Sequence, residues 1–171
     1  MSETQTFPGN DASNEPLVKQ ILALLKGDQA HVSLKAAVAG MPEGLRGVVP
    51  PSLPYSAWQI VEHLRITQRD ILDFSAPPSG GYQHLEWPAG YWPSEAVPPS
   101  GNSWDESLAA IRSDLEAFQA LLTQPEVDLY TPFPWGEGQN LLREALLIAD
   151  HNSYHTGELI VVRRLLGAWP A

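Results

Sequence analysis

The sequence predicts an all-α fold, a four-helix bundle with long connections, and three features of the chain indicate it. Apolar residues recur at spacings of three and four over four separate segments, which is the period of a helix with one buried face. Stretches rich in Pro and Gly, which break helices, separate these segments. Strand-like alternation is not evident, although VDLYTPFPW is compatible with a brief pairing. A chain of 171 residues is expected to form one domain, residues 15–171, after a flexible tail, residues 1–14.

The first helix is expected to begin near Glu15, because Pro16 then occupies a first-turn position that tolerates proline. Its inward stripe would consist of Leu17, Ile21, Leu24, Asp28 and His31. We expect the helix to continue through Val38 despite Gly27, and to end before GMPEG, where Gly and Pro break helices.

The second helix is expected to open at Ser56, a suitable N-cap that has Gln59 three residues later, as in a capping box. Its inward stripe would consist of Ile60, His63, Thr67, Ile71 and Phe74. Residues 76–103 then form a segment too long for a tight turn and too rich in proline for a helix. We expect an ordered crossover that covers the bundle and permits the second and third helices to run parallel.

The third helix is expected to span roughly Trp104 to Leu122, and the last helix is expected to follow Asn140, a good N-cap. Arg163 and Arg164 lie near the end of the last helix, where positive charge favours the helix dipole, and no further role is expected of them.

Two histidines of the last helix, His151 and His155, are four residues apart, so their rings project from the same face. This is the spacing by which one helix supplies two nitrogen ligands to a cation. Asn152 stands where the metalloprotease signature requires Glu, so that class lacks its general base. His63 offers a third imidazole from another inward face. The pattern leaves two interpretations open: a shared metal site, or core histidines that only form hydrogen bonds.

Further side chains are candidates for roles near these histidines. Glu158 is placed to accept a hydrogen bond from an imidazole, with a solvated ion pair as the alternative. His31 is a candidate proton shuttle or fourth ligand, although an ordinary core or surface histidine is the favoured interpretation. Asn152 is a candidate substrate contact. Three tryptophans are candidates for the mouth of a cavity: Trp58, Trp92 and Trp135.

Composition excludes several classes of protein. The net charge is −10, from 20 acidic and 10 basic residues, and the basic residues form no tract, so nucleic acid binding is disfavoured. The absence of cysteine excludes disulfides, zinc-thiolate sites and iron–sulfur clusters. No apolar run approaches the roughly 20 residues of a membrane span, and the N-terminal segment lacks the features of a signal peptide. We therefore expect a cytoplasmic protein that does not bind membranes.

Three stretches carry a resemblance to a known family: YSAWQIVEHLRITQRDILDF, WPAGYWP and LREALLIADHNSYHTGELIVVRRLLGAW. Together they resemble the DinB-like superfamily of metal-dependent four-helix-bundle enzymes, over nearly the whole chain from about residue 17. In that family one histidine of the second helix and an HxxxH pair of the fourth bind a divalent metal. The resemblance therefore implies that His63, His151 and His155 are the metal ligands.

The same resemblance implies a function. Some relatives transfer low-molecular-weight thiols such as bacillithiol or mycothiol, or isomerise maleylpyruvate with a thiol cofactor. The leading expectation is a metal-dependent thiol transferase or hydrolase-type enzyme that acts on a small molecule and forms a homodimer. Zinc or nickel is the expected ion, with iron or manganese also compatible. The alternative is a non-catalytic stress-response protein that binds a metal or a small ligand.

Overall fold

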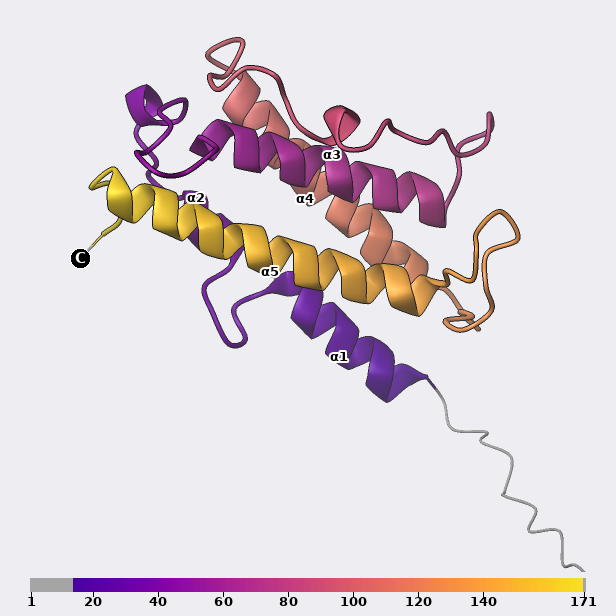
Figure 1. Ribbon diagram of the computed structural model, residues 1–171. Helices are drawn as coiled ribbons and strands as arrows, with labels where there is room; N and C mark the ends of the chain where they lie inside the picture. The colour runs from indigo at the N-terminus through magenta and orange to yellow at the C-terminus, as the bar shows by residue number, and fades with distance from the viewer. Residues whose placement is uncertain (1–13, 171) are drawn as a thin grey trace, which may run out of the picture.

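The computed structural model describes residues 14–170, and every regular element in that range is helical, which confirms the all-α prediction (Figure 1). The helices are α1 (Glu15–Lys26), α2 (Leu34–Val38), α3 (Ala57–Ser75), α4 (Ser103–Leu122) and α5 (Leu141–Leu165), with short 3-10 turns at Glu43–Leu45 and Ala89–Tyr91. The expected tail, residues 1–14, lies outside the described residues except for Asn14. The segment VDLYTPFPW forms no strand.

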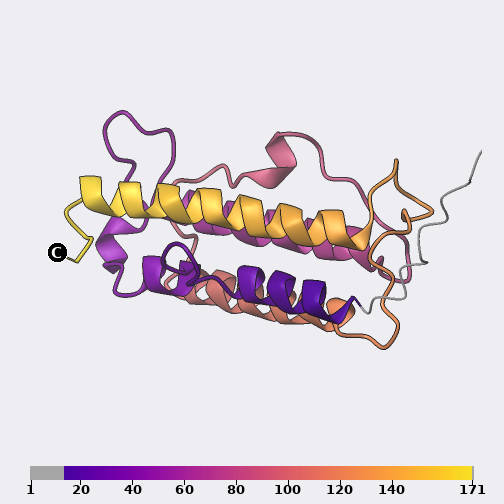
Figure 2. The same ribbon diagram turned by 90° about the horizontal axis from the view of Figure 1, so that it is seen from below.

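The four long helices form the bundle, and α2 extends the wall that α1 begins (Figures 1 and 2). In Figure 1, α3 and α4 run in the same direction, whereas α1 and α5 run in the opposite direction. The crossover between α3 and α4 makes this parallel arrangement feasible, because it returns the chain along the outside of α3. Helix α3 packs against both α4 and α5, and α5 also packs against α1 and α2.

The first helix ends at Lys26, and the prediction that it continues through Val38 was wrong. Gly27 and Asp28 both adopt positive φ, +77° and +59°, which a right-handed helix does not allow. The carboxylate of Asp28 accepts a hydrogen bond from the Ser33 backbone N–H at 2.7 Å, and Ser33 in turn caps α2. Local turn chemistry therefore overrides the apolar periodicity at this position.

Helices α3 and α5 begin at the predicted caps, Ser56 and Asn140. The backbone N–H of Gln59 donates to Ser56 Oγ at 3.2 Å, and the backbone N–H of Ser56 donates to Gln59 Oε1 at 3.1 Å, which completes a capping box. Asn140 Oδ1 accepts the backbone N–H of Arg143 at 2.9 Å at the start of α5. Each such cap stabilises its helix by about 1 kcal/mol.

The apolar core consists of two clusters with a polar layer between them. One cluster joins α1 to the start of α5 and includes Phe118, and the other joins α2 to the end of α5 and includes Trp104. Between them lies Gln68, which is 1% exposed and donates to the Ile111 carbonyl at 2.5 Å. Asn152 donates to Gln68 Oε1 at 3.0 Å, so the polar layer links α3, α4 and α5. Buried amides of this kind are tolerated because their hydrogen bonds are made.

Arg163 is buried, 2% exposed, and its role exceeds the favourable dipole position expected of it. Its guanidinium donates to the carbonyl of Ala37 in α2 and, at 2.8 and 3.1 Å, to the carbonyl of Ala168. The guanidinium also lies 5.1 Å from the ring centroid of Trp169. The side chain therefore fastens α2 and the C-terminal turn to α5.

No helix in the described range is long and apolar enough to cross a membrane.

Candidate metal centre

Three histidines from two helices converge at one point of the bundle. His63 comes from α3, whereas His151 and His155 lie one turn apart on α5. His151 Nε2 lies 3.0 Å from His63 Nε2, although 88 residues separate the two in sequence. One nitrogen from each of the three rings lies within 4.8 Å of the other two. Tertiary packing therefore assembles the cluster that the sequence pattern and the resemblance indicated.

The second nitrogen of two rings is held by a hydrogen-bond acceptor. His63 Nδ1 lies 2.7 Å from the carbonyl oxygen of Tyr91, and His155 Nδ1 lies 2.6 Å from Glu158 Oε2. A carbonyl or carboxylate oxygen only accepts, so the proton of each neutral ring lies on Nδ1. Nε2 of His63 and of His155 is then unprotonated, the form in which imidazole binds a metal. The hydrogen bond to Glu158 is the one that the sequence suggested.

This donor set fits one divalent ion. A metal–nitrogen bond of about 2.0–2.1 Å in a tetrahedral site places two ligating nitrogens about 3.3 Å apart. The spacing between His151 and His63, 3.0 Å, is close to that value. Without an ion, Nε2 of His151 has to donate its proton to the lone pair of His63, because two lone pairs at this distance repel each other. A divalent ion held by these residues would take the place of that proton.

Burial keeps the three imidazoles neutral. His63 and His155 are only 5% and 6% exposed. Desolvation is the main cause that lowers the pKa of His151 and of His155 to about 4, with a further contribution from the neighbouring rings. Desolvation also lowers the pKa of His63, against the opposing effect of the Tyr91 carbonyl. At neutral pH the rings are therefore uncharged, and a metal ion would not have to displace a proton from an imidazolium.

An aromatic stack covers the outer side of the cluster. The indole of Trp92 lies parallel to the ring of His63, with centroids 3.8 Å apart and an interplanar angle of 4°. Tyr55 stacks on Trp92 at 3.9 Å. Of the three tryptophans proposed for a cavity mouth, Trp92 is the one that contacts the histidines. Trp58 is buried in the core, and Trp135 is half exposed and donates to the Phe74 carbonyl.

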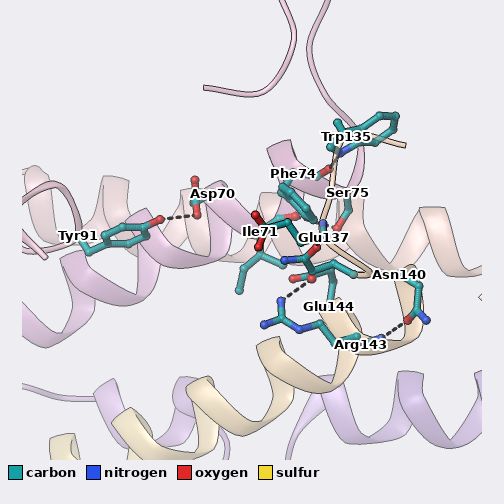
Figure 3. Close-up of polar contacts among 11 residues, drawn as sticks. Asp70, Ile71, Phe74, Ser75, Tyr91, Trp135, Glu137, Asn140, Arg143 and Glu144 are labelled. Carbon is teal, nitrogen blue, oxygen red and sulfur yellow. Dashed lines mark hydrogen bonds and ion pairs between the residues drawn. The ribbon is translucent and has the colours of Figure 1, made fainter. Parts of the chain in front are cut away.

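A carboxylate on α3 holds the crossover segment that orients His63. Asp70 accepts hydrogen bonds from the hydroxyls of Tyr82 and Tyr91, both at 2.8 Å, and Figure 3 shows the second of them. Burial, with the Asp70 carboxylate as the next cause, raises the pKa of Tyr91 to about 12. The carbonyl of the same Tyr91 accepts the His63 proton, so Asp70 stabilises the backbone that fixes the imidazole. Sequence reasoning missed this role, although Asp70 follows His63 by two helical turns on the same face.

Other candidates lie elsewhere. His31 is exposed on the connection between α1 and α2, where its Nε2 lies 3.1 Å from Ser153 Oγ, so it does not join the cluster as a fourth ligand. The cause is the break at Gly27, because a continuous helix would have pointed His31 inward. Asn152 is engaged with Gln68 in the polar layer rather than facing a substrate.

Comparison with known families agrees with this geometry. The family model described as the DinB superfamily matches residues 26–159, a range that includes all three histidines and most of the bundle. Among curated proteins and among solved structures, no match to the chain was found. Because the family match covers well over half of its length, the chain belongs to the DinB superfamily.

Proposed function

We propose that this protein is a metal-dependent enzyme in which His63, His151 and His155 hold one divalent ion, and that it joins a low-molecular-weight thiol to a small electrophilic substrate. The observation that carries the proposal is the convergence of three neutral imidazoles, two of which have Nδ1 occupied and Nε2 free. Hydrogen bonding alone accounts for only part of this arrangement, since a proton on His151 Nε2 serves His63 and leaves Nε2 of His155 with no donor among the three rings.

The donor set supports catalysis rather than a closed structural site. Three protein ligands leave a coordination position for water, thiol or substrate, as in catalytic zinc sites. A divalent ion at this place supplies a Lewis acid that stabilises a thiolate or polarises a carbonyl. Zinc or nickel suits three imidazoles, and iron or manganese is also compatible with them.

An apolar cavity beside the cluster supports a small substrate with an apolar part. Its volume is about 250 Å³, and its lining includes Tyr55, Leu53, Val161 and Glu158. Glu158 holds His155, and Tyr55 stacks on the indole that covers His63, so the cavity reaches the two residues that flank the cluster. Glu158 places one side of this cavity a single hydrogen bond away from His155, although none of the three histidines lines it. Glu158 would then keep His155 oriented while the substrate binds.

Metal analysis of the purified protein tests the ligand set. We expect about one ion per chain in the wild type, and only traces in His63→Ala and His151→Ala, because removal of one of three ligands typically abolishes tight binding. The matched control is His84→Ala, which removes an exposed histidine of the crossover and should retain the metal. Circular dichroism confirms that each variant is folded. Unchanged metal content in His63→Ala would reject the proposed ligands.

Activity assays separate the enzyme from the alternative, a non-catalytic protein that binds a metal or a small ligand in a stress response. A panel of low-molecular-weight thiols with electrophilic acceptors should give metal-dependent product formation. Stoichiometric metal without turnover on any pair would favour the binding role. A protein that binds no metal at all would leave the histidines with a structural role. The homodimer that the resemblance implies is tested separately by light scattering.

A further inference from the structure

The break between α1 and α2 leaves a second cavity on another side of the bundle. Its volume is about 510 Å³, within the range of small-molecule sites. Residues of α1, α2, α4 and α5 and of the α1–α2 connection line it. Figure 1 places this connection and the crossover on opposite sides of the bundle, and Figure 2 shows the connection in front of α4. None of the three clustered histidines lines the cavity.

The rim of this cavity is positively charged in a strongly acidic protein. Lys26, Lys35 and Arg112 line it, which is three of the ten basic residues in a chain with a net charge of −10. Within the described part of the chain, none of these three forms an ion pair, whereas Arg65, Arg69 and Arg143 all do. Asp28 is the one carboxylate of the lining, and it is engaged with a backbone N–H. With three cations against one carboxylate, the rim carries a net positive charge.

The wall of the cavity is mainly apolar, with Asn152 and Thr156 of α5 among its polar members, and a hydrogen bond spans its entrance. Aliphatic side chains line the wall: Leu24, Leu34, Val38, Leu108, Ile111 and Leu115. At the rim, His31 Nδ1 lies 2.9 Å from the Val32 carbonyl, so the proton is on Nδ1 and Nε2 accepts the hydroxyl of Ser153 at 3.1 Å. This hydrogen bond ties the α1–α2 connection to α5. The site is therefore largely pre-formed, which lowers the entropic cost of binding.

We propose that this cavity is a second ligand site, separate from the histidine cluster, which binds a small amphipathic carboxylate. The aliphatic chain of the ligand lies against the leucines, and its carboxylate lies at the rim between Arg112 and the two lysines. An arginine binds a carboxylate through two parallel hydrogen bonds, which makes Arg112 the main determinant of charge selection. A cationic ligand of the same shape is rejected by the rim, and a neutral one loses the charged contacts.

Titration calorimetry with octanoate, octan-1-ol and octylammonium tests the charge preference. Octanoate should bind most tightly, and octylammonium least. Arg112→Gln should weaken octanoate binding by about tenfold, the effect of one lost charge-assisted contact. Lys19→Gln is the matched control, since it removes the same charge from an exposed position of α1 that does not line the cavity.

Three results would overturn the proposal. These are the absence of saturable octanoate binding, binding of octylammonium as tight as that of octanoate, and an Arg112→Gln variant that behaves like Lys19→Gln. His151→Ala distinguishes the two sites of the protein, because it removes a histidine of the cluster and leaves the second cavity intact. Unchanged octanoate affinity in this variant supports a separate site, and loss of binding would place the carboxylate at the cluster instead. This outcome does not depend on whether the proposed enzyme activity is found.

Discussion

Acidification should destabilise the metal-free protein through its buried histidines. Burial lowers the pKa of His151 and of His155 from 6.5 to about 4 in the folded protein. In the unfolded chain both groups return to about 6.5, so the unfolded state binds more protons at every pH between these two values. The contribution of these two histidines to the free energy of unfolding is therefore complete above about pH 6.5, decreases as the pH falls below this value, and becomes constant below about pH 4.

The magnitude follows from the difference in pKa. A difference of one unit corresponds to about 1.4 kcal/mol, and a fall from about pH 7.5 to about pH 5 costs about 2 kcal/mol for each histidine. The pair together should lower the free energy of unfolding by about 4 kcal/mol, a large part of the 5–15 kcal/mol typical of a domain. Saturating metal should raise the free energy of unfolding but should not remove its pH dependence, because the metal-bound imidazoles take up no proton while the histidines of the unfolded chain still do.

Urea unfolding followed by circular dichroism measures this effect after chelation of metal. The matched pair of variants is His151→Asn and His84→Asn, which replace a partly buried and an exposed histidine by the same side chain. The first should lose about 2 kcal/mol less than the wild type between the two pH values, and the second should lose as much as the wild type. Equal losses in all three proteins would refute the conclusion that the cluster is neutral because it is buried.

Three further predictions concern the supports of the cluster and the core. Glu158→Gln should weaken metal binding by about tenfold, because His155 loses a charged acceptor at Nδ1; competition with a chromophoric chelator measures it, and unchanged affinity would contradict the orienting role. Asp70→Asn should lower the pKa of Tyr91 from about 12, as measured by ultraviolet titration, and should weaken metal binding by less than Glu158→Gln does. An unchanged tyrosine titration would exclude the role of Asp70 in holding Tyr91. Phe118→Ala should destabilise the fold by about 3–5 kcal/mol in urea unfolding while metal stoichiometry is retained, since this ring is fully buried in the cluster that joins α1 to the start of α5.

Much of the fold could be read from local patterns in the chain. The starts of α3 and α5 follow from Ser56 and Asn140, whose side chains bond to backbone groups three residues away. The shared face of His151 and His155 follows from helical geometry alone. Each of these features depends on contacts within a few residues, so no knowledge of the packing is needed to predict it.

Apolar periodicity gave wrong or incomplete predictions where a local turn, or hydrogen-bond partners distant in sequence, determined the structure. Gly27 and Asp28 take a left-handed backbone that ends α1, and His31 leaves the bundle interior as a result. Arg163 looked like an ordinary residue of the last turn, but carbonyl groups of α2 and the C-terminal turn surround it. The carbonyl acceptors of the Arg163 guanidinium belong to backbone segments that no spacing in the sequence identifies.

The sequence alone thus determined the four amphipathic segments, the caps of α3 and α5, and the face that His151 and His155 share. Hydrogen bonds and side-chain spacing over one or two turns specify these features. The approach of His63 to that face was established by folding, as were the carbonyl of Tyr91, the indole of Trp92 and the carboxylate of Asp70 around it. These groups come from separate elements, and their positions depend on how α3, α5 and an irregular crossover bury their apolar surface together. The hydrophobic effect is non-directional, so the sequence pattern does not specify which apolar surfaces meet. The sequence therefore identifies the three histidines, but only the packing of the helices brings their nitrogens together.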